Sequence, residues 1–339
     1  MNILIISLII SSLTLIILIQ TDKFSKKYGF YDNPRKELKK IHKKPISNIG
    51  GLACLIPFLI AVLASYFYDD FLSKKYLTVL FVSSICFYFL GRLDDIKNLY
   101  PNRKFLSFSL IFLFFFPFEQ NLIINELNFK YVGFYVDLNS YSIFFTLFCI
   151  FLFYNASNFI DGINGLYGTT LIYWLVFILF KSNYFSLIIV TTLISIIYFL
   201  IFNFKNKVFI GNAGNSFLTC FVASIYIYYY NRFENIYCDE IFLAFFIPGL
   251  DTVRLSLERI FKKRSPFEGD NEHLHHLILK YLNPIKASLG TFLLTVLPMV
   301  ILLLSKNFYI SLIFSLALYS LLVFLLKRNY KKKRNFNKV

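Results

Sequence analysis

The sequence predicts an all-α integral membrane protein, a polytopic bundle of about eleven transmembrane helices. Of its 339 residues, 57% are hydrophobic and only 16% are charged, whereas charged residues make up about 25% of a soluble domain. Apolar runs of about 20 residues, long enough to cross a bilayer, recur along the chain. Composition therefore excludes a soluble protein. The five cysteines are scattered, without the spacing of a zinc site or a disulfide framework.

The expected spans follow the apolar runs in order. The first run has neither the basic start nor the small-residue cleavage site of a secretory signal peptide, so we interpret it as a span. The spans are expected at residues 2–20, 48–67, 77–93, 105–118, 141–159, 168–180, 184–203, 214–230, 239–254, 287–305 and 308–326. Residues 1–326 then form a single transmembrane domain, and residues 327–339 form a basic tail.

Lysine and arginine set the expected orientation. The net charge is +16, and the excess lies in the connection at 23–44, in other short connections and in the tail. Because basic connections stay in the cytoplasm, this charge is a topology signal and does not indicate nucleic-acid binding. An odd number of spans places the amino terminus outside and the carboxyl terminus in the cytoplasm. Residues 119–140 are then an external connection.

Two polar motifs end spans on the side predicted to be cytoplasmic. Asp94 and Asp95 end the third span, where adjacent carboxylates suit a divalent cation, although they could merely solvate a helix end. Asn155, Asn158 and Asp161 recur every three residues and so share one helical face. The glycines after Asp161 would let a ligand approach backbone N–H groups, but a glycine-rich turn capped by asparagine has the same pattern.

Two further motifs fall on the same side. Residues 209–216 are punctuated by glycine and open a membrane helix, so free N–H groups there could hold an anion. We also expect an N-cap from Asn215 or Ser216. Residues 265–276 lie in a basic loop that holds three of the four histidines. These histidines lack the usual spacing of zinc ligands, so they could face phosphate, bind zinc, or belong to a solvated loop.

Taken in order, the motifs resemble those of the polyprenyl-phosphate N-acetylhexosamine-1-phosphate transferase family. The resemblance runs from about Asp32 to Lys280. Besides the motifs above, it rests on the first loop and on the stretch from Pro248 to His276. A leucine interrupts the histidines, which is similar to the branch that starts O-antigen and related polysaccharides rather than to the peptidoglycan branch.

The resemblance implies a reaction and its partners. N-acetylhexosamine-1-phosphate would pass from a UDP-sugar to undecaprenyl phosphate, with release of UMP. The reaction would take place at the cytoplasmic face of a bacterial inner membrane and begin a cell-surface polysaccharide such as the O-antigen of lipopolysaccharide. Mg²⁺, or Mn²⁺ in its place, would bridge the pyrophosphate and screen repulsion between the two substrates. Membrane lipids surround the chain, and a homodimer is a further expectation.

The resemblance also implies three groups of site residues. Catalytic roles would fall to Asp94, Asp95, Asp161 and His275, with Asp94 or Asp95 acting as a base toward the lipid phosphate. The metal would be held by Asp161, Asn212 and Asp95. The substrates would contact Asn158, Asn164, Lys104, Gly211, Asn215, Arg259, His273 and His276. We favour direct attack by the lipid phosphate over a covalent intermediate on an aspartate.

The sequence departs from the family pattern at four positions. The family usually has aspartate at Asn212, serine at Asn215 and arginine at Asn271, and aspartate is common at Asn164. An amide oxygen at 212 brings no charge to a metal, so a catalytically silent member that binds nucleotide sugar or lipid phosphate is one alternative. A transporter of lipid-linked sugars is another, although carriers place polar residues near the bilayer midplane.

Overall fold

Helices dominate the computed structural model, which describes residues 3–32, 44–182, 184, 186–233, 235–265 and 272–336. The predicted all-α class is confirmed. Two short hairpins and a few 3-10 turns complete the described part. The helices are α1 (Ile3–Ile19), α2 (Thr21–Tyr28), α3 (Gly50–Tyr68), α4 (Lys74–Lys97), α5 (Pro101–Phe115), α6 (Ser142–Ile160), α7 (Leu166–Ser182), α8 (Leu187–Asn203), α9 (Gly211–Arg232), α10 (Cys238–Phe261), α11 (Leu274–Leu279), α12 (Pro284–Ser305) and α13 (Phe308–Phe336).

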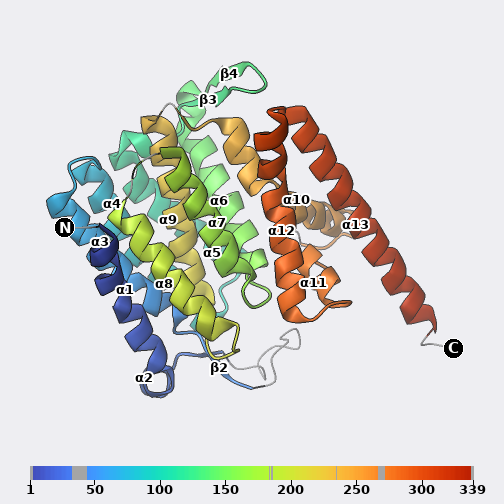
Figure 1. Ribbon diagram of the computed structural model, residues 1–339, viewed down its shortest axis with the longest axis horizontal. Coiled ribbons are helices and arrows are strands. Elements are labelled where there is room, and N and C mark those ends of the chain that lie inside the picture. Colours follow the sequence, from blue (N-terminus) through green and yellow to red (C-terminus); the bar gives the residue numbers. More distant parts are fainter. Residues whose placement is uncertain are drawn as a thin grey trace.

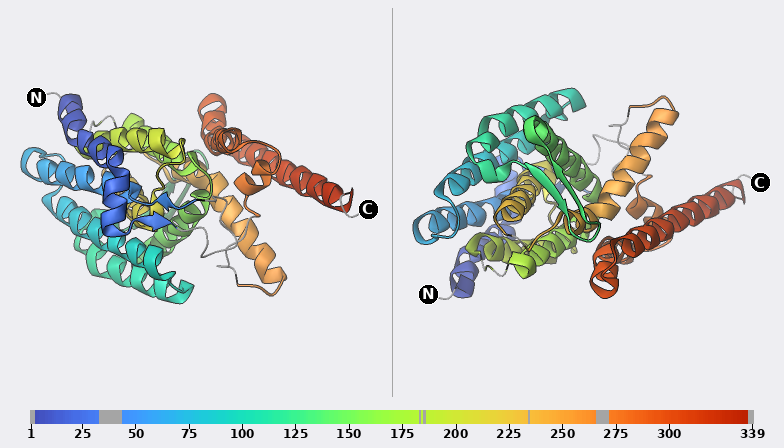
Figure 2. Two further views of the ribbon diagram at one scale, coloured as in Figure 1. Left: turned by 90° about the horizontal axis from the view of Figure 1, so that it is seen from below. Right: turned by 90° about the horizontal axis from the view of Figure 1, so that it is seen from above.

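Helix α9 forms the centre of the larger group of helices (Figures 1 and 2). Every residue from Ala213 to Tyr229 is buried. Helices α3, α4, α6 and α7 pack around it, while α1 and α8 pack together against α3. Because α9 is enclosed by protein, its polar side chains meet partners on neighbouring helices rather than lipid. One example is Tyr167, whose hydroxyl lies 2.9 Å from that of Thr219.

Helices α10 to α13 form a second group beside the first (Figure 1). Helix α12 packs against α10, α11 and α13, and also reaches α7. A small apolar cluster that includes Phe246, Leu274 and Tyr319 joins α10, α11 and α13. Helix α13 then extends away from the bundle (Figures 1 and 2). It continues through the first part of the predicted tail, where Lys327 pairs with Glu258 of α10 at 2.7 Å.

Each of the eleven expected spans overlaps one helix. By length and hydropathy, α3, α4, α6, α12 and α13 could each cross a membrane, and so could the bent pair of α1 and α2. Helices α7 and α8 are apolar but shorter. Helices α5, α9 and α10 do not meet the same criteria of length and hydropathy. Helix α9 can carry polar side chains, which lower its hydropathy, because other helices enclose it. The number of spans and their orientation therefore stay predictions.

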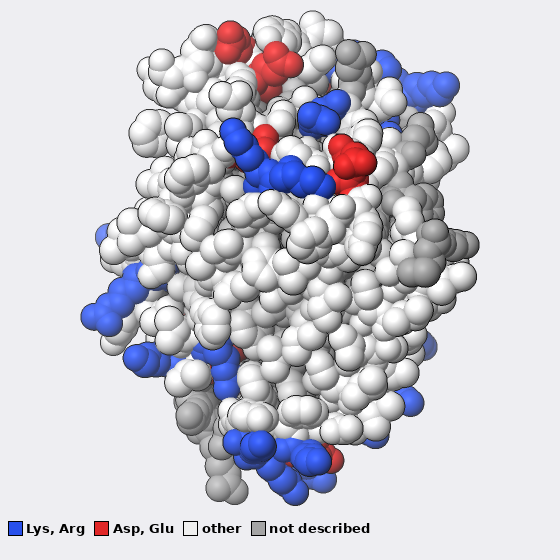
Figure 3. Space-filling model, turned by 90° about the vertical axis from the view of Figure 1, so that its left-hand side faces the viewer, with Lys and Arg blue, Asp and Glu red and all other residues white. Residues whose placement is uncertain are grey.

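The sequence did not predict three features of the described part. Helix α2 turns by 70° from α1. The external connection holds an antiparallel hairpin of β3 (Glu126–Phe129) and β4 (Phe134–Asp137). At the opposite end, β1 (Tyr31–Asp32) pairs with β2 (Ile46–Ser47), next to α2 (Figure 1). Figure 3 shows basic side chains dominating this lower end, while acidic and basic side chains mix at the hairpin end.

Close backbone contacts fix the start of α9 between α3 and α4. A Cβ atom added to Gly51 would lie 2.4 Å from the Gly214 nitrogen, and one added to Gly91 would lie 2.1 Å from the Asn212 carbonyl oxygen. The Gly51 N–H also donates to the Ile210 carbonyl at 3.0 Å. These helices can approach only because both positions lack a side chain. The start of α3, the last turns of α4 and the start of α9 therefore form one unit.

Candidate active site

The paired aspartates at the end of α4 have separate partners. The Asp94 side chain is buried and forms an ion pair with Lys104 of α5, with 2.8 Å between Oδ2 and Nζ. Its other oxygen accepts the Leu99 N–H at 2.9 Å. The Lys104 ammonium also lies over the Tyr154 ring of α6, 5.2 Å from its centroid. Asp94 therefore joins α4, α5 and α6 at the level of the site.

The Asp95 carboxylate caps α9 from α4. It accepts the N–H groups of Asn212 and Ala213 at 2.9 and 3.2 Å, two of the donors that a helix start leaves unsatisfied. This finding corrects the expected N-cap from Asn215 or Ser216, because both residues lie inside the helix and are buried. The helix begins at Gly211, three residues before the expected span. An acidic side chain thus occupies donors that we expected to hold an anion.

Asn212 and Asn215 differ in their surroundings. Asn215 is fully buried, and its side-chain amide donates to the Ser157 carbonyl of α6 at 3.1 Å. Asn212 and Gly211 are partly accessible at the helix start. In the described part of the chain Asn215 therefore links two helices, while Asn212 and Gly211 lie where a ligand could reach them.

Asp161 follows α6 as its C-terminal cap residue. The side chain stays accessible to solvent, and within the described ranges its carboxylate accepts no hydrogen bond. Protein atoms nevertheless surround the carboxyl and remove part of its hydration. This desolvation, with a smaller contribution from the negative charge of Asp95, raises the pKa of Asp161 well above its usual value. Asn158, one turn earlier, is partly accessible, so both could bind a ligand.

Gly162 brings the histidine cluster next to Asp161. A Cβ atom at Gly162 would lie 2.4 Å from His275 Nε2 and 3.0 Å from His276 Nε2. The His275 ring lies parallel to that of His273, with centroids 5.6 Å apart, and 4.2 Å from that of His276. Burial lowers the pKa of His275 well below its usual value, and the neighbouring histidines lower it further. His275 is therefore neutral at neutral pH.

The remaining predicted residues lie around these groups. Arg259 of α10 is buried, with its guanidinium 5.5 Å from the centroid of the Phe159 ring. Asn164 donates to the Asn206 side chain at 2.5 Å on the exposed surface of the same end. The stretch from Pro266 to Asn271 and most of the first loop, residues 33–43, lie outside the described residues.

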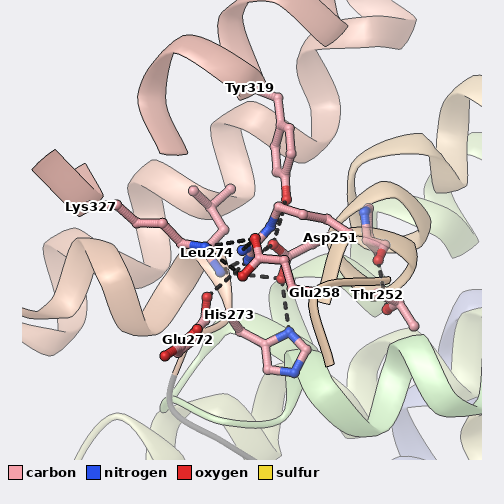
Figure 4. Close-up of polar contacts among 10 residues, drawn as sticks. Asp251, Thr252, Glu258, Glu272, His273, Leu274, Tyr319 and Lys327 are labelled. Carbon is pink, nitrogen blue, oxygen red and sulfur yellow. Dashed lines mark hydrogen bonds and ion pairs between the residues drawn. The ribbon is translucent and has the colours of Figure 1, made fainter. Parts of the chain in front are cut away.

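Two residues that the motifs did not single out for a role complete the site. Asp251 of α10 binds the His273 ring at 2.8 Å, and Tyr319 of α13 donates to Asp251 at 2.6 Å (Figure 4). A carboxylate directly after the apolar run at 241–250 was a usable signal for Asp251. Tyr319 had no such signal, because tyrosine is common throughout this chain. A cavity beside them is lined by apolar side chains of α6 and α10, by two threonines of α12, and by Asp251, His273 and His275.

The residues present suit a magnesium ion shared with a phosphate ligand. Mg²⁺ is usually held by one or two carboxylates together with substrate phosphates and waters. Asp161 offers an accessible carboxylate. Asn158, one turn earlier in α6, and Asn212, at the start of α9, offer amide oxygens. In the described part of the chain no three His, Cys, Asp or Glu side chains group as a metal site, so the histidine cluster gives no support to zinc.

Comparisons with known proteins support the family resemblance. Residues 77–230 match the family model described as glycosyl transferase family 4. The chain is 25% identical to the undecaprenyl-phosphate alpha-N-acetylglucosaminyl 1-phosphate transferase of Thermotoga maritima, over 75% of this chain and 74% of that protein. The Escherichia coli K12 protein of the same name is 26% identical, over 76% and 71%. The phospho-N-acetylmuramoyl-pentapeptide-transferase of Dictyoglomus thermophilum is 28% identical, over 77% and 82%.

Proposed function

Because the chain belongs to glycosyl transferase family 4, we propose that it transfers N-acetylhexosamine-1-phosphate from a UDP-sugar to undecaprenyl phosphate. The relatives above are named as transferases of N-acetylglucosaminyl 1-phosphate with undecaprenyl phosphate, or of phospho-N-acetylmuramoyl-pentapeptide. One observation carries the proposal to this chain. Gly162, directly after the accessible Asp161, packs against His275 and His276, and the negative charge of Asp95, which caps α9, acts on the Asp161 carboxyl.

The chemistry is a displacement at phosphorus. An oxygen of undecaprenyl phosphate attacks the donor phosphorus that carries the sugar, and a new P–O bond forms. The bond between the two donor phosphates breaks, and its electron pair leaves with UMP. Both substrates are anionic, so the site must lower their repulsion and hold them in line. Asp94 and Asp95 contribute here by fixing Lys104 and the α9 start, respectively.

Mg²⁺ would neutralise charge on the donor diphosphate when it is bound. Asp161 would hold it, together with the amide oxygens of Asn158 and Asn212. Asp95 would support the metal indirectly, because both of its oxygens accept backbone N–H groups of α9. Removing divalent cations with EDTA should therefore abolish turnover, and Mg²⁺ or Mn²⁺ should restore it.

The site end of the molecule is the basic end, which supports a cytoplasmic active site in a bacterial inner membrane (Figure 3). A nucleotide sugar is available on that side. The leucine between the histidines supports the branch that begins O-antigen and related polysaccharides. Product formation at this face would place the lipid-linked sugar in the inner leaflet for later extension.

A direct assay tests the proposal. Purified protein in detergent receives undecaprenyl phosphate, Mg²⁺ and one radiolabelled UDP-N-acetylhexosamine at a time, and the lipid phase is counted and identified by mass spectrometry. We expect labelled lipid diphosphate with at least one donor and UMP in equal amount. No product with any UDP-N-acetylhexosamine would overturn the proposal.

Asn212 favours a second candidate, a silent member that binds substrate without turnover. The carboxylate usual in the family is replaced by an uncharged amide at the accessible start of α9. The Asn212→Asp variant separates the two candidates. If the wild type is active, the variant should need less Mg²⁺ for half-maximal rate. An inert wild type together with an active variant would favour the silent candidate.

The transporter alternative predicts a different result. In sealed proteoliposomes it would move lipid-linked sugar between leaflets without forming it. The predicted polar motifs meet at helix ends, where Asp95 caps α9 and Gly162 packs against His275, whereas a carrier holds its site near the midplane. Flux without new lipid diphosphate would be needed to favour transport.

A further inference from the structure

A hydrogen-bond network around Asp251 holds the His273 ring (Figure 4). Asp251 is 7% exposed. Its Oδ2 lies 2.8 Å from His273 Nδ1, and its Oδ1 accepts from Arg254 Nη2 at 2.8 Å and from the Tyr319 hydroxyl at 2.6 Å. The Leu274 N–H also points to both oxygens, at 3.3 and 3.2 Å. Arg254, Tyr319 and Leu274 all donate to it, so Asp251 is held as a carboxylate.

This network requires a hydrogen on Nδ1 of His273. A carboxylate can only accept, so Nδ1 must be the donor of the bond to Asp251. Nε2 is the nitrogen left for a ligand. It is buried and has no hydrogen-bond partner within the described residues. The Phe159 ring lies 4.5 Å from the His273 ring, tilted by 32°, and limits its rotation.

The position of Nε2 connects this network to the diphosphate site. His273 lines the cavity between α6, α10, α11 and α12. Its ring stacks on that of His275, which in turn contacts Gly162 directly after Asp161. A buried nitrogen without a partner costs free energy unless a ligand supplies one. An anionic phosphate oxygen would be such a partner for the imidazolium form of the ring, which carries a hydrogen on Nε2 as well as on Nδ1.

Resting on the proposed function, we propose that Asp251 is a positioning residue that fixes His273 with Nε2 directed toward a phosphate oxygen of the donor. No proton is transferred. The Nε2–H hydrogen bond offsets charge as the bond between the donor phosphates breaks and UMP leaves. This arrangement follows the general logic in which a carboxylate fixes the tautomer and orientation of an imidazole.

Arg254 and Tyr319 fix Asp251 in turn. Arg254 Nε donates to the Tyr319 oxygen at 2.7 Å, and Arg254 Nη2 reaches the Glu272 carbonyl at 2.9 Å, just before the histidines. Helix α13 therefore contributes to the site through Tyr319, although it lies at the edge of the molecule (Figure 2). The network lies beyond residues 77–230, which match the family model.

The first test does not depend on activity. The chain has four histidines, so solid-state NMR of protein labelled with ¹⁵N-histidine in lipid bilayers can resolve their ring nitrogens, and His273→Ala identifies the signals of His273. We expect a protonated Nδ1 for His273 in the wild type and a changed Nδ1 signal in Asp251→Asn. An unchanged His273 pattern in Asp251→Asn would overturn the proposal.

The second test is kinetic. Misplacing the imidazole should lower kcat about 10–100-fold in Asp251→Asn, with a smaller change in KM. The double variant with His273→Ala should be no slower than His273→Ala alone, because Asp251 acts through His273. If the two losses multiply in the double variant, Asp251 has a structural role separate from His273, which would contradict the proposal. Tyr319→Phe should show a smaller loss in the same direction and provides a milder variant if Asp251→Asn does not fold.

A matched control separates positioning from general burial. Asp239 lies on the same helix, is fully buried and accepts the Tyr131 N–H at 2.6 Å, at the hairpin end of the molecule. We expect Asp239→Asn to leave kcat and the His273 signals close to those of the wild type. An equal loss of kcat in both variants would contradict the proposal. If the wild type transfers no sugar phosphate, the proposed function fails, and the NMR result still decides the role of Asp251.

Discussion

At the residue scale, Asp161 differs from Asp94 and Asp95 in the partners of its carboxylate. Lys104 pairs with Asp94, and two N–H groups of α9 bind Asp95. Asp161 is accessible and accepts no hydrogen bond from the residues that the structure describes. We therefore expect substitution of Asp94 or Asp95 to lower the stability of the protein. Substitution of Asp161 should lower the rate of transfer instead.

Asp161→Asn should lose most transfer activity without unfolding. Removing the carboxylate that would hold Mg²⁺ at the diphosphate is expected to lower kcat at least about a hundredfold. Thermal unfolding should stay near that of the wild type, because the carboxylate supports no other side chain in the described part. Initial rates of lipid product and a melting curve in detergent measure both effects. Activity above about one third of the wild-type rate would contradict the assigned role.

The sequence located several site residues because their chemistry is rare in apolar helices. Asp94, Asp95, Asp161 and the histidines stand out from lipid-compatible neighbours. Their partners were harder to predict. The sequence did not indicate that Asp95 caps α9, because that contact joins residues 117 apart. Tyr319 is one of 24 tyrosines, and only packing of α13 against α10 brings it to Asp251.

At the scale of elements, Gly162 sets the distance between the end of α6 and α11. Gly162→Ala should push His275 away, because the new methyl group would lie 2.4 Å from Nε2. We expect about a tenfold or greater loss of kcat, since small misplacements of site groups are costly. Gly290→Ala in α12 is the control. Its Cβ would meet nothing within 4 Å, so activity should be unchanged there. Full activity in Gly162→Ala would show that transfer does not require the close packing of Gly162 against His275.

Gly91→Ala tests how the start of α9 is held. Its methyl group would clash with the Asn212 carbonyl, which should separate α4 from α9 and weaken both hydrogen bonds to Asp95. Overpacking of this kind costs about 1–3 kcal/mol. The melting temperature in detergent should fall in Gly91→Ala and stay level in Gly290→Ala. Equal melting temperatures would mean that the two helices can move apart at little cost.

Element positions could be predicted better than element ends. Apolar runs predicted a helix for every expected span, because the bilayer demands long runs of apolar residues. The start of α9 was placed three residues late because its cap comes from another helix. The hairpin of β3 and β4 and the bend before α2 lie outside the lipid-spanning runs, where hydropathy carries no signal for local structure.

At the scale of the whole molecule, the site end and the hairpin end should lie on opposite sides of the membrane. Lys205 lies exposed just before the start of α9, and Lys130 lies exposed between the hairpin strands. In intact cells, a membrane-impermeant maleimide should label Lys130→Cys, and it should label Lys205→Cys only after permeabilisation. The parent chain with its native cysteines is the control. The reverse pattern would contradict the orientation, and labelling of both from one side would contradict the topology.

The central claim is that the chain transfers a sugar together with its phosphate. UDP-N-acetylhexosamine labelled with ³²P only in the phosphate that carries the sugar, incubated with the protein, undecaprenyl phosphate and Mg²⁺, tests this claim most directly. Our account predicts that the label moves into the lipid phase together with the sugar and that unlabelled UMP is released. Label that stays in UDP while sugar enters the lipid, or no labelled lipid with any donor, would contradict it.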